Sequence, residues 1–216
     1  MLFYNFVRLI VGGGSAAAYR VRIHGREHLP AEGGYVLAPS HRSMMDIPFA
    51  AWLSRRPLRY MGKASLFRIP LAGAFFRSLG GFAVARDGTD RKALRDAMAM
   101  LQAGDVLLVY PEGTRQHGPK IQALQPGAAY LALRAGVPIV PVGLSGTEEI
   151  LRSRRLKLPR FGRVEMVVGE PIVSPTRAGG GVVPRDQVDE LTARLHDALQ
   201  VVFDDANERR ERSANR

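Results

Sequence analysis

The first residues with chemical potential are a histidine and a carboxylate five positions apart, His41 and Asp46. A carboxylate beside an imidazole fixes its tautomer and stabilises the imidazolium that forms on proton uptake. Residues five apart on an ideal helix point about 140° apart, so the pair meets only if His41 lies at the irregular entry to a helix. Ser40 is suited to cap that helix. The spacing fits a general base oriented by Asp46, and it also fits a strand-end histidine beside an unrelated helical aspartate.

The second group is the run Glu112, Gly113, Thr114 and Arg115. Glycine allows close backbone approach, threonine and backbone amides donate hydrogen bonds, and an arginine fork clamps an anion. Arg86, at the end of another apolar run, is within reach of the same anion. The four residues also suit an ordinary turn, and a single arginine is often surface charge. An anion site is therefore a hypothesis at this point.

Both groups follow apolar runs typical of buried strands, at residues 35–38 and 106–110. The remaining pattern predicts strands at 21–23, 58–61, 82–85, 138–144 and 164–168, and helices at 47–53, 71–79, 90–102, 127–134 and from Pro184 onward. Alternating strands and helices predict an α/β fold, a layered sandwich with a mixed, largely parallel sheet flanked by helices. Active sites in such folds collect at the carboxyl ends of the strands.

The chain ends have different expected roles. Residues 1–20 are predicted to be a membrane-interface segment, because apolar side chains recur on one helical face: Leu2, Phe3, Phe6, Leu9 and Ile10. The glycines at 12–14 interrupt the run of about 20 apolar residues that a spanning helix needs. The alternative is a helix packed on the domain. Residues 21–206 are predicted to form one domain including the C-terminal helix, with a flexible link at 177–181 and a disordered charged tail at 207–216.

The composition limits the kinds of partner and of chemistry that we expect for this protein. The 216 residues contain 31 Lys and Arg against 20 Asp and Glu, a net charge of +11. This excess favours anionic partners such as a membrane surface, a phosphorylated substrate or nucleic acid. A general use of arginine as a solvated cation explains part of it equally well. The chain has no cysteine, which excludes disulfides, cysteine-ligated zinc and a cysteinyl acyl-enzyme.

Two further motifs lead to weaker hypotheses. Residues 24–28 match the H-x-x-E-H pattern of zinc peptidases. That chemistry needs both histidines on one stable helix, whereas Gly25 weakens a helix and Pro30 ends one. We therefore predict a turn and no metal site. Residues 143–147 miss the G-x-S-x-G nucleophile elbow by one glycine, which argues against a serine hydrolase.

Four blocks, in this order, resemble those of the glycerolipid acyltransferases, the 1-acylglycerol-3-phosphate acyltransferases and their relatives. They are His41-x4-Asp46 and the segments 81–86, 111–115 and 137–141. Residues 25–30 are also similar to that family's segment before its histidine, and the resemblance extends over residues 21 to 175. The chain departs from the family pattern at Ser40, where asparagine is common, and at 116–118, which lack the usual acidic or serine-rich start.

The resemblance implies direct transfer of a fatty acyl group from a thioester to the free hydroxyl of lysophosphatidic acid, forming phosphatidic acid. The donor would be acyl-CoA or acyl-carrier protein, with no cofactor and no metal. His41 would be the general base and Asp46 its orienting partner. The substrate-binding residues would be Lys63, Arg86, Glu112, Gly113, Thr114 and Arg115. The segment 137–141 would help to shape the pocket.

The same resemblance and the basic charge imply a peripheral protein on the cytoplasmic face of a membrane, bound to its anionic surface, with no nucleic acid expected. Two alternatives stay open. One is an acyltransferase for another lysophospholipid or a glycolipid. The other is a non-enzymatic, basic protein that binds membranes or nucleic acid, which leaves His41 and Asp46 without a role.

Overall fold

The computed structural model describes residues 2–84, 91–150, 162–173 and 183–214. Their centre is a seven-stranded sheet in the order β1-β7-β6-β2-β5-β3-β4, in which β6 and β7 pair antiparallel and every other neighbouring pair is parallel. The strands are β1 (Arg22–His24), β2 (Tyr35–Pro39), β3 (Leu58–Lys63), β4 (Gly81–Val84), β5 (Val106–Leu108), β6 (Ile139–Ser145) and β7 (Glu165–Val168). The predicted α/β fold with a mixed, largely parallel sheet is confirmed.

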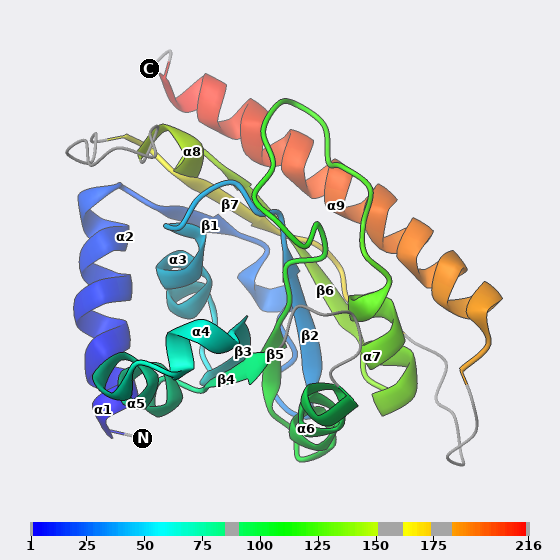
Figure 1. Cartoon of the computed structure of the whole chain (residues 1–216). Coiled ribbons are helices and arrows are strands. Elements are labelled where there is room, and N and C mark those ends of the chain that lie inside the picture. The colour runs from blue at the N-terminus through cyan, green and yellow to red at the C-terminus, as the bar shows by residue number, and fades with distance from the viewer. Residues whose placement is uncertain (1, 85–90, 151–161, 174–182, 215–216) are drawn as a thin grey trace.

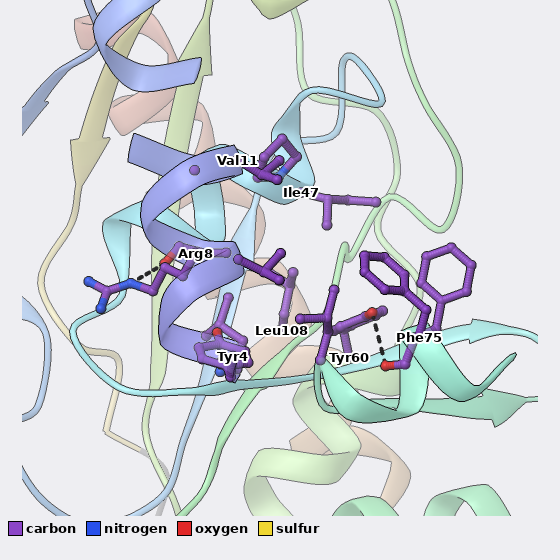
Figure 2. Close-up of a pocket in the computed structure, with 14 residues that line it drawn as sticks. Tyr4, Arg8, Val11, Ile47, Tyr60, Phe75 and Leu108 are labelled. Atoms are coloured by element: carbon purple, nitrogen blue, oxygen red, sulfur yellow. Dashed lines mark hydrogen bonds between the residues drawn. The ribbon is translucent and has the colours of Figure 1, made fainter. Parts of the chain in front are cut away.

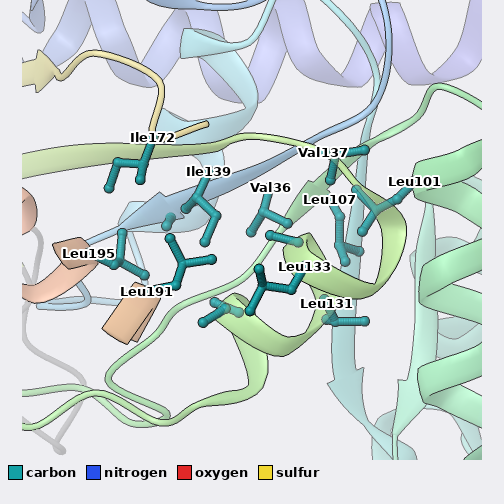
Figure 3. Packing of buried hydrophobic residues seen from close by; sticks show 14 of the residues in the cluster. Val36, Leu101, Leu107, Leu131, Leu133, Val137, Ile139, Ile172, Leu191 and Leu195 are labelled. Atoms are coloured by element: carbon teal, nitrogen blue, oxygen red, sulfur yellow. The ribbon is translucent and has the colours of Figure 1, made fainter. Parts of the chain in front are cut away.

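Helices cover both faces of the sheet. Successive strand residues point to opposite faces, so neighbouring residues of β2 pack against different helices. Val36 packs on the face covered by α6 (Arg91–Gln102), α7 (Gly127–Ala135) and α9 (Arg185–Ala214), and Figure 3 shows this cluster. Leu37 packs on the other face, covered by α3 (Asp46–Leu53) and the N-terminal helix (Figure 1). The shorter elements are η2 (Arg26–His28), α4 (Ala64–Phe67), α5 (Pro70–Ser78) and α8 (Thr147–Ile150). The sequence pattern did not predict α4 or α8.

The N-terminal segment is helical in three consecutive parts: α1 (Leu2–Val7), the π-helix η1 (Arg8–Gly13) and α2 (Gly14–Ala18). Its glycines let it approach α3, since a Cβ on Gly13 would lie 2.9 Å from the Trp52 ring. Arg8 stabilises the same contact, because its Nε donates a hydrogen bond to the Ala51 carbonyl at 3.0 Å. The helix therefore packs on the domain, yet its outer side chains Leu2, Phe3, Phe6, Leu9 and Ile10 stay exposed. No helix in the described part of the chain is long and apolar enough to cross a bilayer.

The C-terminal tail corrects one prediction. Residues 207–214 belong to α9, so the expectation of a disordered tail from 207 is wrong for them. The helix continues because its inner side still finds partners: Ala206 is buried, and Ser213 donates to Glu165 of β7 at 3.2 Å. Tertiary contact thus outweighs the charged composition. The predicted link at 177–181 lies outside the described residues.

Candidate active site

The two candidate groups meet at one edge of the sheet. Strands β2 and β5 are parallel neighbours, so the chain segments that follow them emerge side by side. The His41 amide donates to Glu112 Oε1 at 2.8 Å, and the Gln116 amide donates to the His41 carbonyl at 2.8 Å. These bonds fix the backbone on both sides of the imidazole.

His41 and Asp46 form the predicted pair. His41 Nδ1 lies 2.9 Å from Asp46 Oδ2, and the carboxylate is fully buried. The same oxygen accepts from the amides of Arg42 at 2.6 Å and Ser43 at 2.8 Å. Because α3 begins at Asp46, His41 lies at the entry to the helix, which confirms that prediction.

Ser40 does not have the predicted role. The N-cap position of α3 is Met45, and no side chain caps it. Ser40 is buried and its hydroxyl oxygen accepts from the Leu144 amide of β6 at 3.0 Å. The prediction that Ser40 caps the helix is therefore wrong. Residues 41–45 separate Ser40 from the start of α3, and the amides of Arg42 and Ser43 in that turn donate to Asp46.

The arrangement leaves one nitrogen of His41 ready to accept a proton. With Nδ1–H donating to the carboxylate, Nε2 carries the lone pair, and no described residue forms a hydrogen bond with it. The ring lines a cavity of about 350 Å³ together with Tyr60, Tyr110 and Gly113. A proton donor bound in this cavity can therefore meet an oriented base.

A second, apolar cavity of about 180 Å³ adjoins the first, since Ile47, Tyr60 and Leu108 line both. Figure 2 shows it between the N-terminal helix, which contributes Tyr4 and Val11, and α5, which contributes Phe75. A largely apolar lining suits a hydrocarbon chain, because burying apolar surface there is favourable.

Glu112 has a different place from the one predicted. It is buried, and its two oxygens accept from the amides of His41 at 2.8 Å and Gln122 at 3.4 Å. The Arg42 guanidinium lies 3.9 Å from the second oxygen. Glu112 therefore braces the His41 segment. Its predicted part in the phosphate site stays a prediction, and a buried carboxylate would repel a phosphate if the two made direct contact.

The other predicted binding residues lie around the cavity to differing degrees. Gly113 lines it, with a φ of 71° that favours glycine, while Thr114 and Arg115 are exposed beside it. Lys63 ends β3 and pairs in register with Val84, which also lines the cavity. Arg86 lies outside the described residues. The structure thus brings Gly113, Thr114, Arg115 and the backbone of Lys63 to the same edge.

Sequence reasoning missed Arg42. Its guanidinium is buried, donates to the carbonyls of Gly118 at 3.2 Å and Lys120 at 3.3 Å, and lies 4.3 Å from the centre of the Phe203 ring in α9. Arg42 thus ties the His41 segment to the loop after Arg115 and to the C-terminal helix. No local pattern distinguishes it from a solvated arginine, because all partners of its guanidinium are distant in sequence.

Tyr110 was also missed, since it appeared only as the end of a strand. Its ring stacks on that of His41, with centroids 4.0 Å apart and planes inclined by 22°. Burial, with a smaller contribution from the charge of Asp46, raises the pKa of Tyr110 well above its ordinary value, so the phenol stays neutral. An aromatic residue directly before Pro111 was the available signal.

The H-x-x-E-H match is a turn, as predicted. Residues 26–28 form the single 3-10 turn η2, which cannot place both histidines on one helical face. His24 Nε2 lies 2.8 Å from Glu165, and His28 Nδ1 lies 2.8 Å from the Val168 carbonyl. The described residues contain no cluster of ligands that would hold a metal.

A histidine held by a buried aspartate, facing a cavity at the carboxyl ends of a mostly parallel sheet, defines an α/β protein with a site suited to proton abstraction. Comparison with known proteins identifies the family within this class. The family model described as Acyltransferase matches residues 20–145, which include His41, Asp46 and the turn at 111–115. The chain belongs to this Acyltransferase family, and the resemblance seen in the sequence is confirmed.

Individual relatives agree. The chain is 34% identical over 159 residues to a 1-acyl-sn-glycerol-3-phosphate acyltransferase of Chlamydomonas reinhardtii, covering 71% of this chain and 47% of the relative. It is 27% identical over 153 residues to the enzyme of that name from Bacillus subtilis, covering 70% and 73%. The match thus spans about half the length of the algal relative.

The crystal structure of PlsC, the 1-acyl-sn-glycerophosphate acyltransferase of Thermotoga maritima, has a similar fold. The TM-score is 0.71, and the alignment covers 92% of this chain and 79% of that one at 24% identity. This likeness supports the layered α/β architecture described above.

Proposed function

We propose that this protein transfers a fatty acyl group from a thioester to the free hydroxyl of lysophosphatidic acid, forming phosphatidic acid. The observation that carries the proposal is the His41 imidazole, which lines the cavity, is held by Asp46 through Nδ1 and has no hydrogen bond with a described residue at Nε2. The names of the algal and Bacillus relatives support lysophosphatidic acid as the acceptor.

The chemistry is a single direct transfer. His41 Nε2 takes the proton of the acceptor hydroxyl as its oxygen attacks the thioester carbonyl, so a C–O bond forms. The C–S bond then breaks, its electron pair leaves on sulfur, and the imidazolium returns the proton to the thiolate. Asp46 stabilises the imidazolium between these steps. A base of this kind typically contributes ~10²–10⁴ in rate.

The acceptor phosphate is proposed to bind at the exposed end of the cavity, with Thr114, Arg115, Lys63 and Arg86. Binding there converts a diffusional encounter into a positioned one. Arg115→Ala should raise the acceptor KM about tenfold, the effect of one charged hydrogen bond, and leave the thioester KM unchanged. Arg194→Ala, which removes an exposed arginine of α9, is the matched control. A rise in the thioester KM alone would move the phosphate site elsewhere.

An acyl chain is proposed to occupy the apolar cavity beside the His41 site (Figure 2). An acyl chain there would lie next to the catalytic cavity and the reacting carbonyl, because the two cavities have lining residues in common. Filling it with Val11→Phe should shorten the preferred chain, as read from product masses, with little change in the affinity for the phosphate.

The protein is proposed to bind peripherally to the anionic cytoplasmic face of a membrane. The contact surface, here called the bilayer face, comprises the exposed apolar residues of the N-terminal helix and of α5: Leu2, Phe3, Phe6, Leu9, Ile10, Leu71 and Phe75. The rings of Phe3 and Phe75 join the two helices, with centroids 6.4 Å apart. The net charge of +11 adds attraction to anionic lipid.

Vesicle co-sedimentation tests this face. Phe6→Asp should weaken binding to anionic phospholipid vesicles at least tenfold, since it places a charge where an apolar ring would enter the interface. Val201→Asp is the matched control, because Val201 is an equally exposed apolar residue on α9. Equal losses in both variants would show that net charge, and not the bilayer face, drives binding.

The direct test of the activity is a matrix of donors and acceptors read by mass spectrometry. Acyl-CoA and acyl-carrier protein are each paired with lysophosphatidic acid, lysophospholipids of larger head group and glycolipids. We expect phosphatidic acid as the main product, and the donor that supports it is identified in the same experiment. Preference for another acceptor would replace the proposed substrate, and failure to consume any thioester would refute an acyltransferase.

A further inference from the structure

We infer that Tyr110 is a positioning residue for His41, and that its aromatic ring sets the orientation of the imidazole and stabilises its protonated form. The inference rests on the proposed function, since it gives Tyr110 a role in that reaction. Its basis is the stacked contact of the two rings, 4.0 Å between centroids and 22° between planes.

The stack supplies the one restraint that the hydrogen bonds leave out. Asp46 holds the imidazole at a single atom, Nδ1, and the ring can still tilt about that bond. Glu112 and Gln116 hold only the His41 backbone, through its amide and its carbonyl. Tyr110 covers the face of the ring, and so it holds the imidazole in one orientation beside the cavity that both residues line.

The same contact favours the charged intermediate. When His41 takes the acceptor proton it becomes a cation lying over an aromatic face, an arrangement that attracts electrostatically and more strongly where water is excluded. The hydroxyl end of the Tyr110 ring is removed from water, since its oxygen is fully buried, while the residue also lines the cavity. Loss of the aromatic face should therefore lower kcat by about 3- to 30-fold.

The ring, and not the hydroxyl, carries this role. No described residue forms a hydrogen bond with Tyr110 Oη, and burial keeps the phenol neutral by raising its pKa. A neutral hydroxyl without a partner is not placed to relay a proton from His41. Tyr110→Phe preserves the aromatic face and should therefore behave as the unsubstituted protein.

The test compares Tyr110→Phe with Tyr110→Leu and Tyr110→Met, which remove the aromatic face and keep an apolar side chain. We expect the Leu and Met variants to lose about tenfold in kcat with KM for both substrates within about twofold, and Phe to restore kcat. Melting temperatures establish that each variant is folded. Unchanged kcat in both aliphatic variants, or an equal loss in the Phe variant, would overturn the inference.

Proton NMR of the histidine rings separates this inference from the proposed function. Stacking should shift the His41 ring protons upfield, in a signal assigned by its absence from His41→Gln, and the shift should persist in Tyr110→Phe and vanish in Tyr110→Leu. An unshifted signal in the unsubstituted protein would refute the stack. A shifted signal in a protein that transfers no acyl group would refute the proposed function instead.

Discussion

Two histidine–carboxylate pairs with nearly the same geometry lie in different parts of this molecule. His41 and Asp46 are 2.9 Å apart at the carboxyl ends of β2 and β5, and His24 and Glu165 are 2.8 Å apart where β1 meets β7. Both carboxylates are buried, with exposed fractions of 0% and 1%. Distance and burial therefore do not distinguish a candidate base from a structural pair.

The difference lies in the second nitrogen of each ring. His24 uses Nε2 toward Glu165, and its Nδ1 faces an Arg209 nitrogen at 3.4 Å, so both nitrogens are engaged. His41 uses Nδ1 toward Asp46, its Nε2 forms no hydrogen bond with a described residue, and the residue lines the cavity. His24 is in fact the more exposed ring, 33% against 15%, so solvent access is not the criterion either. A lone pair directed into a substrate-sized space is what a base requires.

The largest difference in activity between the two pairs is expected when their carboxylates are substituted. Asp46→Asn should reduce kcat by ~10²–10⁴, because a neutral amide neither fixes the tautomer nor stabilises the imidazolium. Glu165→Gln should leave kcat within about twofold, since no described part of the reaction site touches it. The contrast is measured by the acyl-transfer rates of both variants, with melting temperatures to establish that each variant is folded. Equal losses would mean that the two pairs do not differ as described.

A smaller effect is expected from the arginines that support the two pairs. Arg42→Met should lower kcat/KM about tenfold and the free energy of unfolding by about 1–3 kcal/mol, because the carbonyls of Gly118 and Lys120 lose their buried donor. Arg22→Met, at the Glu165 pair, is the control, and the exposed guanidinium of Arg22 should contribute under about 1 kcal/mol. Chemical denaturation and steady-state kinetics give both values. A larger loss in Arg22→Met would reverse the assignment.

The smallest effect on activity is expected at His24. His24→Ala should keep kcat within about twofold and lower the free energy of unfolding by about 1–3 kcal/mol, since Glu165 remains buried with one partner fewer. The C-terminal turn of α9 should fray first, because Ser213 and Arg209 contact the same cluster. Hydrogen exchange of residues 207–214 reports this directly. Unchanged protection there would contradict the structural role of the pair.

The contrast also shows what local sequence information carries. His41 and Asp46 are five residues apart, so helix geometry alone decided where the histidine had to lie for the two to meet. The strands were predictable for a similar reason, since a buried parallel strand is a short apolar run flanked by turns, as at residues 35–38 and 138–144.

Contacts between distant residues explain what the sequence did not reveal. Glu112 appeared to be part of an anion-binding turn, and only its bond to the His41 amide 71 positions away makes it a brace. Arg42 is buried through partners 76 and 78 positions away, and His24 meets Glu165 across 141 positions. The helical end of α9 follows from the same cause, because Ser213 is held by Glu165 of a distant strand.

The central claim is that His41 is the base of an acyl transfer to lysophosphatidic acid. Its most direct test measures, on His41→Ala, both kcat for acyl transfer and the dissociation constant for lysophosphatidic acid, beside the unsubstituted protein. If His41 is the base, kcat falls by ~10²–10⁴ while the dissociation constant stays within about threefold. Undiminished turnover, or a loss explained wholly by weaker binding of the acceptor, would contradict it.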